Sequence, residues 1–192
     1  PSSSLDLPYL SAVTRIPTLT ENGEIVQKPG YNKDAKVFYA EQRGLDIPVV
    51  PKNPTPEQLN AAVELIKSIF ADFPFDGQSY DENMKNPPAS MVNAIGLLIQ
   101  PFARPAYADC TPATLITKPA VGTGASLLAS VCQTIVSGRT DVRPPFASGE
   151  DEIRKALYTA IKSQAPYLFY DNLTGNLDSP TLAASLTSTT FT

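Results

Sequence analysis

Apolar and polar residues follow one another along the chain in patterns that predict several short helices and strands. The clearest pattern follows Thr55, where apolar residues recur three or four positions apart and therefore share one helical face. These residues are Leu59, Ala62, Val63, Ile66, Ile69, Phe70 and Phe73. Thr55 and Gln58 form a Thr-x-x-Gln capping box, with Pro56 in the first turn. We predict a core helix that begins after Thr55 and ends at Asp72-Phe73-Pro74.

Helical spacing returns in four later segments. One covers residues 88–100 and is expected to end at Pro101, because proline cannot donate a helical hydrogen bond. The next covers residues 126–136 and ends at Gly138, and another begins at Ser148, with Asp151 three residues on. The last begins at Asp178-Ser179-Pro180. The apolar residues of these helices are Met91, Ile95, Leu98, Ile99, Leu127, Leu128, Val131, Ile135, Ile153, Leu157, Ala160, Ile161, Leu182 and Leu186.

Strand signals lie in the first 40 residues of the chain and again after residue 110. Residues 14–20 and 25–26 flank Asn22-Gly23, which supplies the positive φ angles of a tight hairpin turn, and residues 36–39 form a further strand. Residues 113–117 are a short apolar strand, and residues 167–171 are a second one that ends in a carboxylate. The order strand, helix, helix, strand, helix implies an α/β fold, in which helices cover the faces of a parallel sheet.

Composition and charge narrow the chemistry. The chain has 192 residues and no histidine, which excludes Ser-His-Asp and Cys-His nucleophile systems and histidine-ligated metals. Reactions must use carboxylates, lysine or arginine, hydroxyls, backbone amides or a hard cation such as Mg²⁺. The net charge of −4 provides no general attraction to nucleic acid. Basic and aromatic residues do not alternate along the chain as they do in single-strand binding surfaces.

The two cysteines, Cys110 and Cys132, form neither a CxxC motif nor a disulfide framework. Cys132 falls in an apolar helical pattern, which favours a small buried residue over a functional thiol. No apolar run approaches the roughly 18 residues of a membrane span, and no signal peptide opens the chain. We therefore expect a soluble cytoplasmic protein without a membrane partner. Because the chain starts at Pro1 rather than Met, we expect a fragment of a longer protein.

A glycine-rich loop, residues 118–126, lies between the predicted strand 113–117 and the next helix. In a phosphate-binding P-loop, glycines let backbone N–H groups converge on an anion at a helix N-terminus, and a hydroxyl binds Mg²⁺. Aligned on Ser126, the GxxxxGK[ST] pattern matches at Gly124 but has Pro119 and Ala125 in place of glycine and lysine. The context nevertheless predicts a nucleotide site. Its residues are Lys118, Gly122, Thr123, Gly124, Ala125 and Ser126.

Asp171 follows the apolar run 168–170, as the Mg²⁺-binding aspartate follows its strand in P-loop ATPases. Together Ser126 and Asp171 are the predicted metal ligands. Asp171 and Asn172 are the predicted catalytic residues, although asparagine can orient an attacking water but cannot accept its proton. ATP and Mg²⁺ are the expected cofactors.

Two points about the loop stay open. Lys118 either folds back over the phosphates and replaces the missing lysine, or remains a solvated residue at the end of a strand. A dinucleotide-binding Rossmann loop fits less well, because Leu127 stands where its third glycine or alanine belongs. A kinase-like phosphotransferase is disfavoured, because the sequence shows no second basic cluster for an acceptor phosphate.

Four segments, residues 117–128, 149–155, 170–175 and 177–187, resemble the AAA+/superfamily III-like P-loop ATPase modules of phage, prophage and plasmid replication proteins. These helicase-like modules are often fused to a primase–polymerase domain. The resemblance implies a nucleotide as ligand, nucleic acid as a partner of the full-length protein, and a homo-oligomeric ring. It places the phosphate-binding roles of the Walker A motif on Gly122, Gly124 and Ser126. It places the Mg²⁺-binding role of the Walker B motif on Asp171.

The pattern of elements divides the chain into a β-rich N-terminal segment (1–54), a helical segment that packs on the core (55–109) and a core with a parallel sheet (110–192), which the resemblance identifies as a partial P-loop NTPase core. We therefore expect the ATP-binding and ATP-hydrolysing core of a replicative helicase-like protein. From the resemblance we also expect a fragment that lacks the sensor strand and the arginine finger of such a motor. The alternative is a degenerate P-loop domain that binds no nucleotide and serves as a scaffold, which Ala125 and Asn172 favour.

Overall fold

The computed structural model describes residues 8–42, 44–75, 86–107, 109–120, 122–140, 145–163 and 165–188. It is a mixed α/β structure with two compact units. The first unit comprises residues 1–52 and 102–108, and the second comprises residues 53–101 and 109–192. The organisation into segments 1–54, 55–109 and 110–192 stays a prediction.

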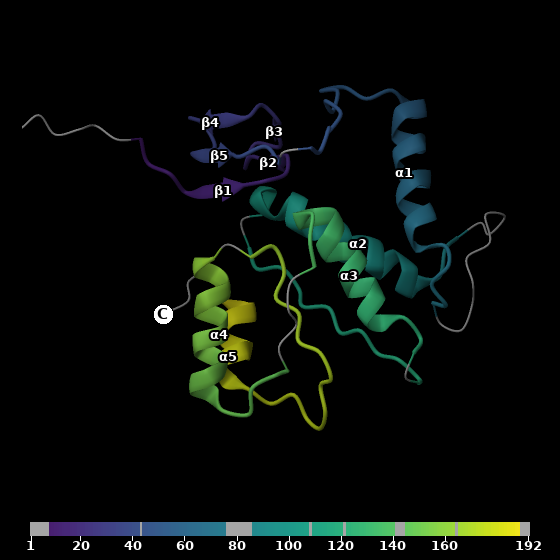
Figure 1. The fold of residues 1–192 in the computed structure, drawn as a ribbon, viewed down its shortest axis with the longest axis vertical. Helices are drawn as coiled ribbons and strands as arrows, with labels where there is room; N and C mark the ends of the chain where they lie inside the picture. Colours follow the sequence, from purple (N-terminus) through teal and green to yellow (C-terminus); the bar gives the residue numbers. More distant parts are fainter. Residues whose placement is uncertain are drawn as a thin grey trace, which may run out of the picture. The chain divides into compact units, whose positions relative to one another are not determined.

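The first unit is built on a small mixed sheet with the strand order β1-β5-β4 (Figure 1). Strand β5 (Val37–Tyr39) pairs in parallel with β1 (Ala12–Thr14) and antiparallel with β4 (Gly30–Asn32). A separate hairpin joins β2 (Thr18–Leu19) to β3 (Ile25–Val26), and a 3₁₀ turn, η1 (Arg104–Ala106), belongs to the same unit. Val26 and Tyr39 are its buried apolar residues.

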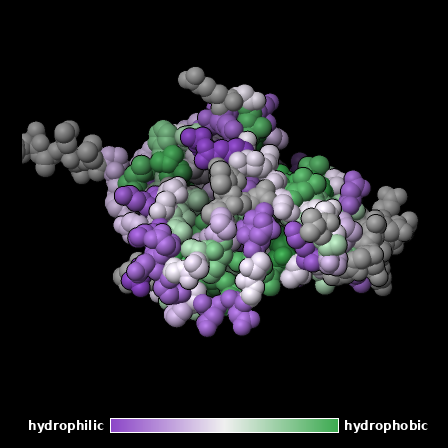
Figure 2. Space-filling model, turned by 60° about the horizontal axis from the view of Figure 1, so that its bottom comes forward, coloured by the Kyte–Doolittle hydropathy of each residue, from purple (hydrophilic) through white to green (hydrophobic). Residues whose placement is uncertain are grey.

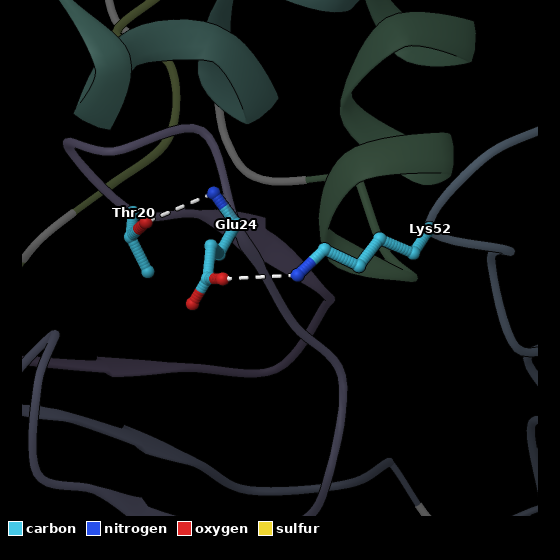
Figure 3. Close-up of polar contacts among 3 residues, drawn as sticks. All are labelled: Thr20, Glu24 and Lys52. Atoms are coloured by element: carbon cyan, nitrogen blue, oxygen red, sulfur yellow. Dashed lines mark hydrogen bonds and ion pairs between the residues drawn. The ribbon is translucent and has the colours of Figure 1, made fainter.

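The predicted hairpin is confirmed, with shorter strands than its sequence pattern indicates. Gly23 has a φ of 75°, the left-handed conformation for which the Asn-Gly pair is suited. Within the turn, the Glu24 N–H donates to Thr20 Oγ1 over 3.0 Å, and Lys52 Nζ lies 3.4 Å from Glu24 Oε1 (Figure 3). Both ion-pair partners are exposed, so the turn geometry, rather than this pair, stabilises the hairpin.

Helix α1 (Pro56–Phe70) begins as predicted, with Thr55 as its N-cap and both hydrogen bonds of the capping box in place. The predicted core face is wrong in the first half of the helix and holds in the second, where Ile66 and Ile69 are half-buried and Phe70 is buried. Within α1, all of which the structure describes, Phe70 is the buried residue, whereas Leu59 is 57% exposed. The reason is that helical spacing predicts which residues share a face but not whether another element covers that face.

Helix α2 (Ala89–Ala103) continues past Pro101, contrary to the predicted stop. Pro101 lacks the N–H that would bond to the carbonyl of Leu97, four residues earlier. The Tyr167 hydroxyl donates to that carbonyl over 2.7 Å and lies 3.3 Å from the carbonyl oxygen of Leu98. A side chain distant in sequence therefore satisfies the acceptor that proline leaves open, and the helix extends for another half turn.

Three further helices follow the predicted order. Helix α3 (Ala125–Ser137) ends at Gly138 as expected and buries Cys132 completely, but Leu127 and Ile135 are exposed. Helix α4 (Glu150–Lys162) begins after Gly149 rather than Ser148. Helix α5 (Pro180–Thr187) is capped by Ser179 and lies beside α4 (Figure 1).

The side chain of Glu150 links the two neighbouring helices. The Thr181 N–H at the start of α5 donates to Glu150 Oε2 over 3.0 Å. Hydrogen bonds from Thr181 and Ser179 and the charge of Arg154 lower the pKa of this carboxylate. The first turn of α4 therefore holds the first turn of α5 through a charge-assisted hydrogen bond.

The predicted parallel sheet of the core is not found among the described residues. Residues 113–117 form no strand, and Leu115 is 68% exposed. Of residues 167–171, only Asp171 pairs, through one parallel bridge to Pro145. A strand exists only where a neighbouring backbone completes its hydrogen bonds, and an apolar run does not determine that neighbour. The α/β class is confirmed in this coarse form, while the P-loop core stays a proposal.

Apolar side chains also reach the surface, where they lie among polar ones (Figure 2). None of the helices in the described ranges is both long and apolar enough to span a membrane.

Candidate functional site

Two glycines of the loop have a left-handed backbone conformation. Gly122 and Gly124 have φ angles of 88° and 92°, a region that residues with a Cβ rarely adopt. Between them, the Thr123 hydroxyl donates to the carbonyl of Ala120 over 3.1 Å and closes the loop. The two glycines therefore turn the chain sharply just before helix α3.

Helix α3 begins at Ala125, with Gly124 as its N-cap. The first bond of the helix joins the Leu128 N–H to the Gly124 carbonyl over 2.8 Å. Glycine has no side chain to accept from the first-turn N–H groups, in contrast to the caps Thr55 of α1 and Ser179 of α5. An anion at this terminus would meet N–H donors and the positive end of the helix dipole.

Ser126 and Asp171 lie together although 45 residues separate them in sequence. Ser126 Oγ donates to Asp171 Oδ2 over 3.4 Å, which is at the long end of a hydrogen bond. Ser126 is exposed in the first turn of α3, and Asp171 is half-buried. The structure thus brings the hydroxyl and the carboxylate of the two predicted motifs to one place.

The backbone after Asp171 holds its other carboxylate oxygen. The Asn172 N–H donates to Asp171 Oδ1 over 2.9 Å, and Asn172 has a φ of 55°. Asparagine tolerates this left-handed conformation better than most residues do. The exposed Asn172 side chain therefore extends from a left-handed backbone turn. The sequence prediction of a water-orienting asparagine did not include this conformation.

Pro145 and Phe146 lie against the Asp171 segment, and sequence reasoning did not include either of them in the site. Pro145 forms the parallel bridge with Asp171, and the Phe146 ring packs edge-on against Tyr170 at a centroid distance of 5.0 Å. Burial raises the pKa of the Tyr170 hydroxyl, whose oxygen has no hydrogen-bond partner in the described part of the chain. These contacts position the backbone that carries Asp171.

Phe73 is a second neighbour that was not predicted as a site residue. Its ring carbons lie 3.6 Å from the position that a Cβ on Gly124 would occupy. Phe73 belongs to an aromatic cluster with Phe70 and Phe75, in which centroid distances are 6.0–6.4 Å. A sequence signal for this neighbourhood is the aromatic end of the helix pattern that begins at Thr55.

Lys118 and Ala125 are the remaining predicted site residues. Lys118 is exposed on the segment that leads into the loop, and both of its predicted roles, phosphate contact and solvated side chain, stay predictions. Ala125 is the first residue of α3 and contributes a backbone N–H without a charged side chain.

Two oxygen donors, the Ser126 hydroxyl and the Asp171 carboxylate, fit Mg²⁺, which prefers hard oxygen ligands. In the described ranges, no group of three or more Asp, Glu, His or Cys side chains is arranged to hold a metal ion. A magnesium ion here would therefore depend on nucleotide phosphates and water for its other ligands.

Comparisons of the chain with protein-family models, with curated proteins and with solved structures found no match.

Proposed function

We propose that the second unit binds ATP with Mg²⁺ and hydrolyses it, as the nucleotide-binding core of a helicase-like replication protein of a phage or another mobile element. The observation that carries the proposal is the contact between Ser126 Oγ and Asp171 Oδ2 at the start of a helix preceded by two left-handed glycines. A hydroxyl, a carboxylate and a helix N-terminus are the parts that hold a magnesium–nucleotide complex in P-loop enzymes.

Each residue has a defined role in this proposal. The backbone from Gly122 to Ala125 cradles phosphate oxygens, with the Thr123 hydroxyl holding the loop closed. Ser126 and Asp171 orient Mg²⁺ and its water ligands. Asn172 orients the attacking water, and Lys118 supplies the positive charge that Ala125 lacks.

The wider setting is part of the same proposal. Hydrolysis would drive remodelling of nucleic acid by a ring of subunits in the cytoplasm.

A scaffold without nucleotide is the second candidate function. Two observations favour it: Ala125 places no cation at the helix N-terminus, and the Asn172 N–H already occupies one oxygen of Asp171. In that case the contact between Ser126 and Asp171 would serve only to tie two segments together.

Calorimetric titration of the chain with Mg-ATP separates the two candidates. Nucleotide binding predicts a saturable heat that weakens when Mg²⁺ is omitted and in the variants Ser126→Ala and Asp171→Ala. Ser137→Ala is the matched control, because it removes a hydroxyl at the opposite end of the same helix, where Ser137 donates to the Gln133 carbonyl.

The same titration with Lys118→Ala tests the displaced lysine. Loss of affinity in this variant would assign Lys118 to the phosphates, and unchanged affinity would leave it solvated. An absence of heat at millimolar Mg-ATP in the folded wild-type chain would contradict the nucleotide site and favour the scaffold.

A further inference from the structure

The sheet of the first unit carries a row of apolar and aromatic side chains on its exposed face. Val13, Phe38 and Tyr31 are direct cross-strand neighbours, because Phe38 of β5 pairs with Val13 of β1 and with Tyr31 of β4. Their side chains are 49%, 41% and 38% exposed. We call this set the sheet row.

The opposite face of the same sheet is covered. The residues that alternate with the sheet row along the strands are half-buried or buried, and Tyr39 is only 2% exposed. Successive side chains of a strand point to opposite faces, so the burial pattern fixes the sheet row on the open side. Three large side chains left in water at adjacent positions are a feature of binding surfaces.

Three cations lie around the sheet row. Lys33 and Lys36 belong to the turn that joins β4 to β5, and Arg15 directly follows β1; all three are exposed. One acid, Asp34, lies in the same turn. A second exposed acid, Glu41, follows β5 at the end of the sheet where Arg15 lies. The three cations therefore exceed the two acids around the row by one, although the whole chain is acidic.

One of these lysines is held beside the row by its contacts. The Tyr31 hydroxyl donates to the carbonyl of Tyr9 over 2.8 Å, and Lys36 Nζ lies 5.5 Å from the centroid of the Tyr9 ring. A cation at this distance from an aromatic face is attracted to it. Lys36 is thus kept near the Tyr31 end of the sheet row.

We propose that this face binds single-stranded nucleic acid, with bases stacked on Phe38 and Tyr31 and phosphates in contact with Lys33, Lys36 and Arg15. Aromatic side chains on an open sheet accept the faces of unpaired bases, and nearby cations attract the backbone. The outer strands are about 10 Å apart, so the row has room for about two bases.

The charges decide between this occupant and a protein. A second copy of the chain or another apolar partner would have to bring carboxylates to neutralise the three cations, whereas a polynucleotide presents one phosphate with every base. The proposal does not depend on ATP binding, because every residue that carries it belongs to the first unit.

Fluorescence anisotropy with a labelled oligothymidylate of about 15 nucleotides, within the usual site size of such surfaces, tests the proposal without nucleotide present. We expect Phe38→Ala and Tyr31→Ala each to weaken binding by about 5- to 100-fold, the usual effect of losing one stacked base. Tyr158→Ala is the control, because it removes an exposed ring from α4 in the second unit.

Two further variants separate stacking from loss of structure. Phe38→Trp keeps an aromatic face and should retain the wild-type affinity, which a merely destabilised sheet would not. Lys33→Ala with Lys36→Ala should reduce the slope of log affinity against log salt by about 0.7 for each phosphate that these lysines neutralise in the wild type. Lys52→Ala, which removes a cation paired with Glu24, should leave that slope unchanged.

Several outcomes would overturn the inference. The first is failure of the folded wild-type chain to bind the oligonucleotide at about 100 μM, which is the weak end of non-specific affinities. The second is an equal affinity of the wild type and the Phe38→Ala and Tyr31→Ala variants. The third is an affinity for duplex DNA equal to that for the single strand. Sedimentation in which the wild type is dimeric and Phe38→Ala is monomeric would assign the face to a second copy instead. Asp171→Ala should bind the oligonucleotide like the wild type, so failure of the ATP site leaves this test intact.

Discussion

The hydrogen bond between Tyr167 and the end of helix α2 leads to a quantitative prediction. Tyr167→Phe keeps the ring but removes the donor that satisfies the Leu97 carbonyl, which Pro101 leaves without its helical partner. The ring also stays in contact with Phe169, at a centroid distance of 5.1 Å. The substitution therefore isolates the hydrogen bond from the packing of the side chain.

The expected cost follows from the burial of the acceptors. Leu97 and Leu98 are only 6% and 3% exposed, so water has little access to their carbonyl groups. A buried polar group left without a partner costs about 1–3 kcal/mol, more than the net value of an ordinary hydrogen bond. We expect Tyr167→Phe to lower the free energy of unfolding by about 2 kcal/mol.

Urea unfolding tests both the size of this cost and the proposed reason for it, the missing N–H of Pro101. The four proteins to compare are the wild type, Tyr167→Phe, Pro101→Ala and the double variant. Pro101→Ala restores the N–H that can reach the Leu97 carbonyl, so the loss of the Tyr167 hydroxyl should cost about 1 kcal/mol less in that background. Tyr158→Phe, on the exposed face of α4, is the control and should change stability by less than about 0.5 kcal/mol.

Two results would refute this reasoning. One is a cost of Tyr167→Phe within about 0.5 kcal/mol of zero, which is the range of ordinary surface substitutions. The other is an equal cost with proline or alanine at position 101. In that case the Tyr167 hydroxyl would stabilise the chain without compensating for Pro101.

Four further outcomes follow, one from the same tyrosine and three from other parts of the structure. Burial raises the pKa of Tyr167 above its usual 10.0, so its contribution to stability is complete below about pH 10 and is lost as the pH rises; urea midpoints should fall less steeply with pH in Tyr167→Phe. The pKa of Glu150 is lowered from 4.5, so its contribution is present above about pH 4.5 and is lost on acidification, an effect that Glu150→Gln should reduce in acid titrations of helicity. Gly124→Ala should lower the melting temperature through its φ of 92°, whereas Gly96→Ala, inside α2 with open space around it, should raise stability by about 0.5–1 kcal/mol. Ser179→Ala removes the cap of α5 and should lower the free energy of unfolding in urea by about 1 kcal/mol. Ser179→Thr is the control, because it keeps a capping hydroxyl and should leave the free energy of unfolding unchanged.

The candidate site was predictable in its residue types but not in its geometry. Glycines before an apolar helix indicated a phosphate-binding loop, and the structure adds that Gly122 and Gly124 have positive φ angles. The contact of Ser126 with Asp171 depends on a chain path of 45 residues, which spacing alone does not specify. The left-handed backbone of Asn172 and the ring of Phe73 beside Gly124 had no sequence signal tied to the site.

Local sequence is sufficient to predict the features that are held by local hydrogen bonds. The capping box at Thr55, the cap at Ser179, the glycine end of α3 and the Asn22-Gly23 turn each involve residues within a few positions of one another. Such contacts form wherever the chain adopts the element, so local sequence predicts them.

Contacts between distant segments depend on how the whole chain folds. Residues 113–117 have the composition of a strand yet form none, because strand pairing needs a second backbone that local composition does not specify. Helix α2 passes Pro101 because Tyr167 supplies the missing donor. The row of Val13, Phe38 and Tyr31 exists only because three strands pair in one register. Tyr31, Lys33, Lys36 and Phe38 lie within eight positions of one another, a local alternation of basic and aromatic residues that the sequence analysis did not single out. Strand pairing brings Val13 to this segment, since cross-strand neighbours are set by pairing and not by sequence order.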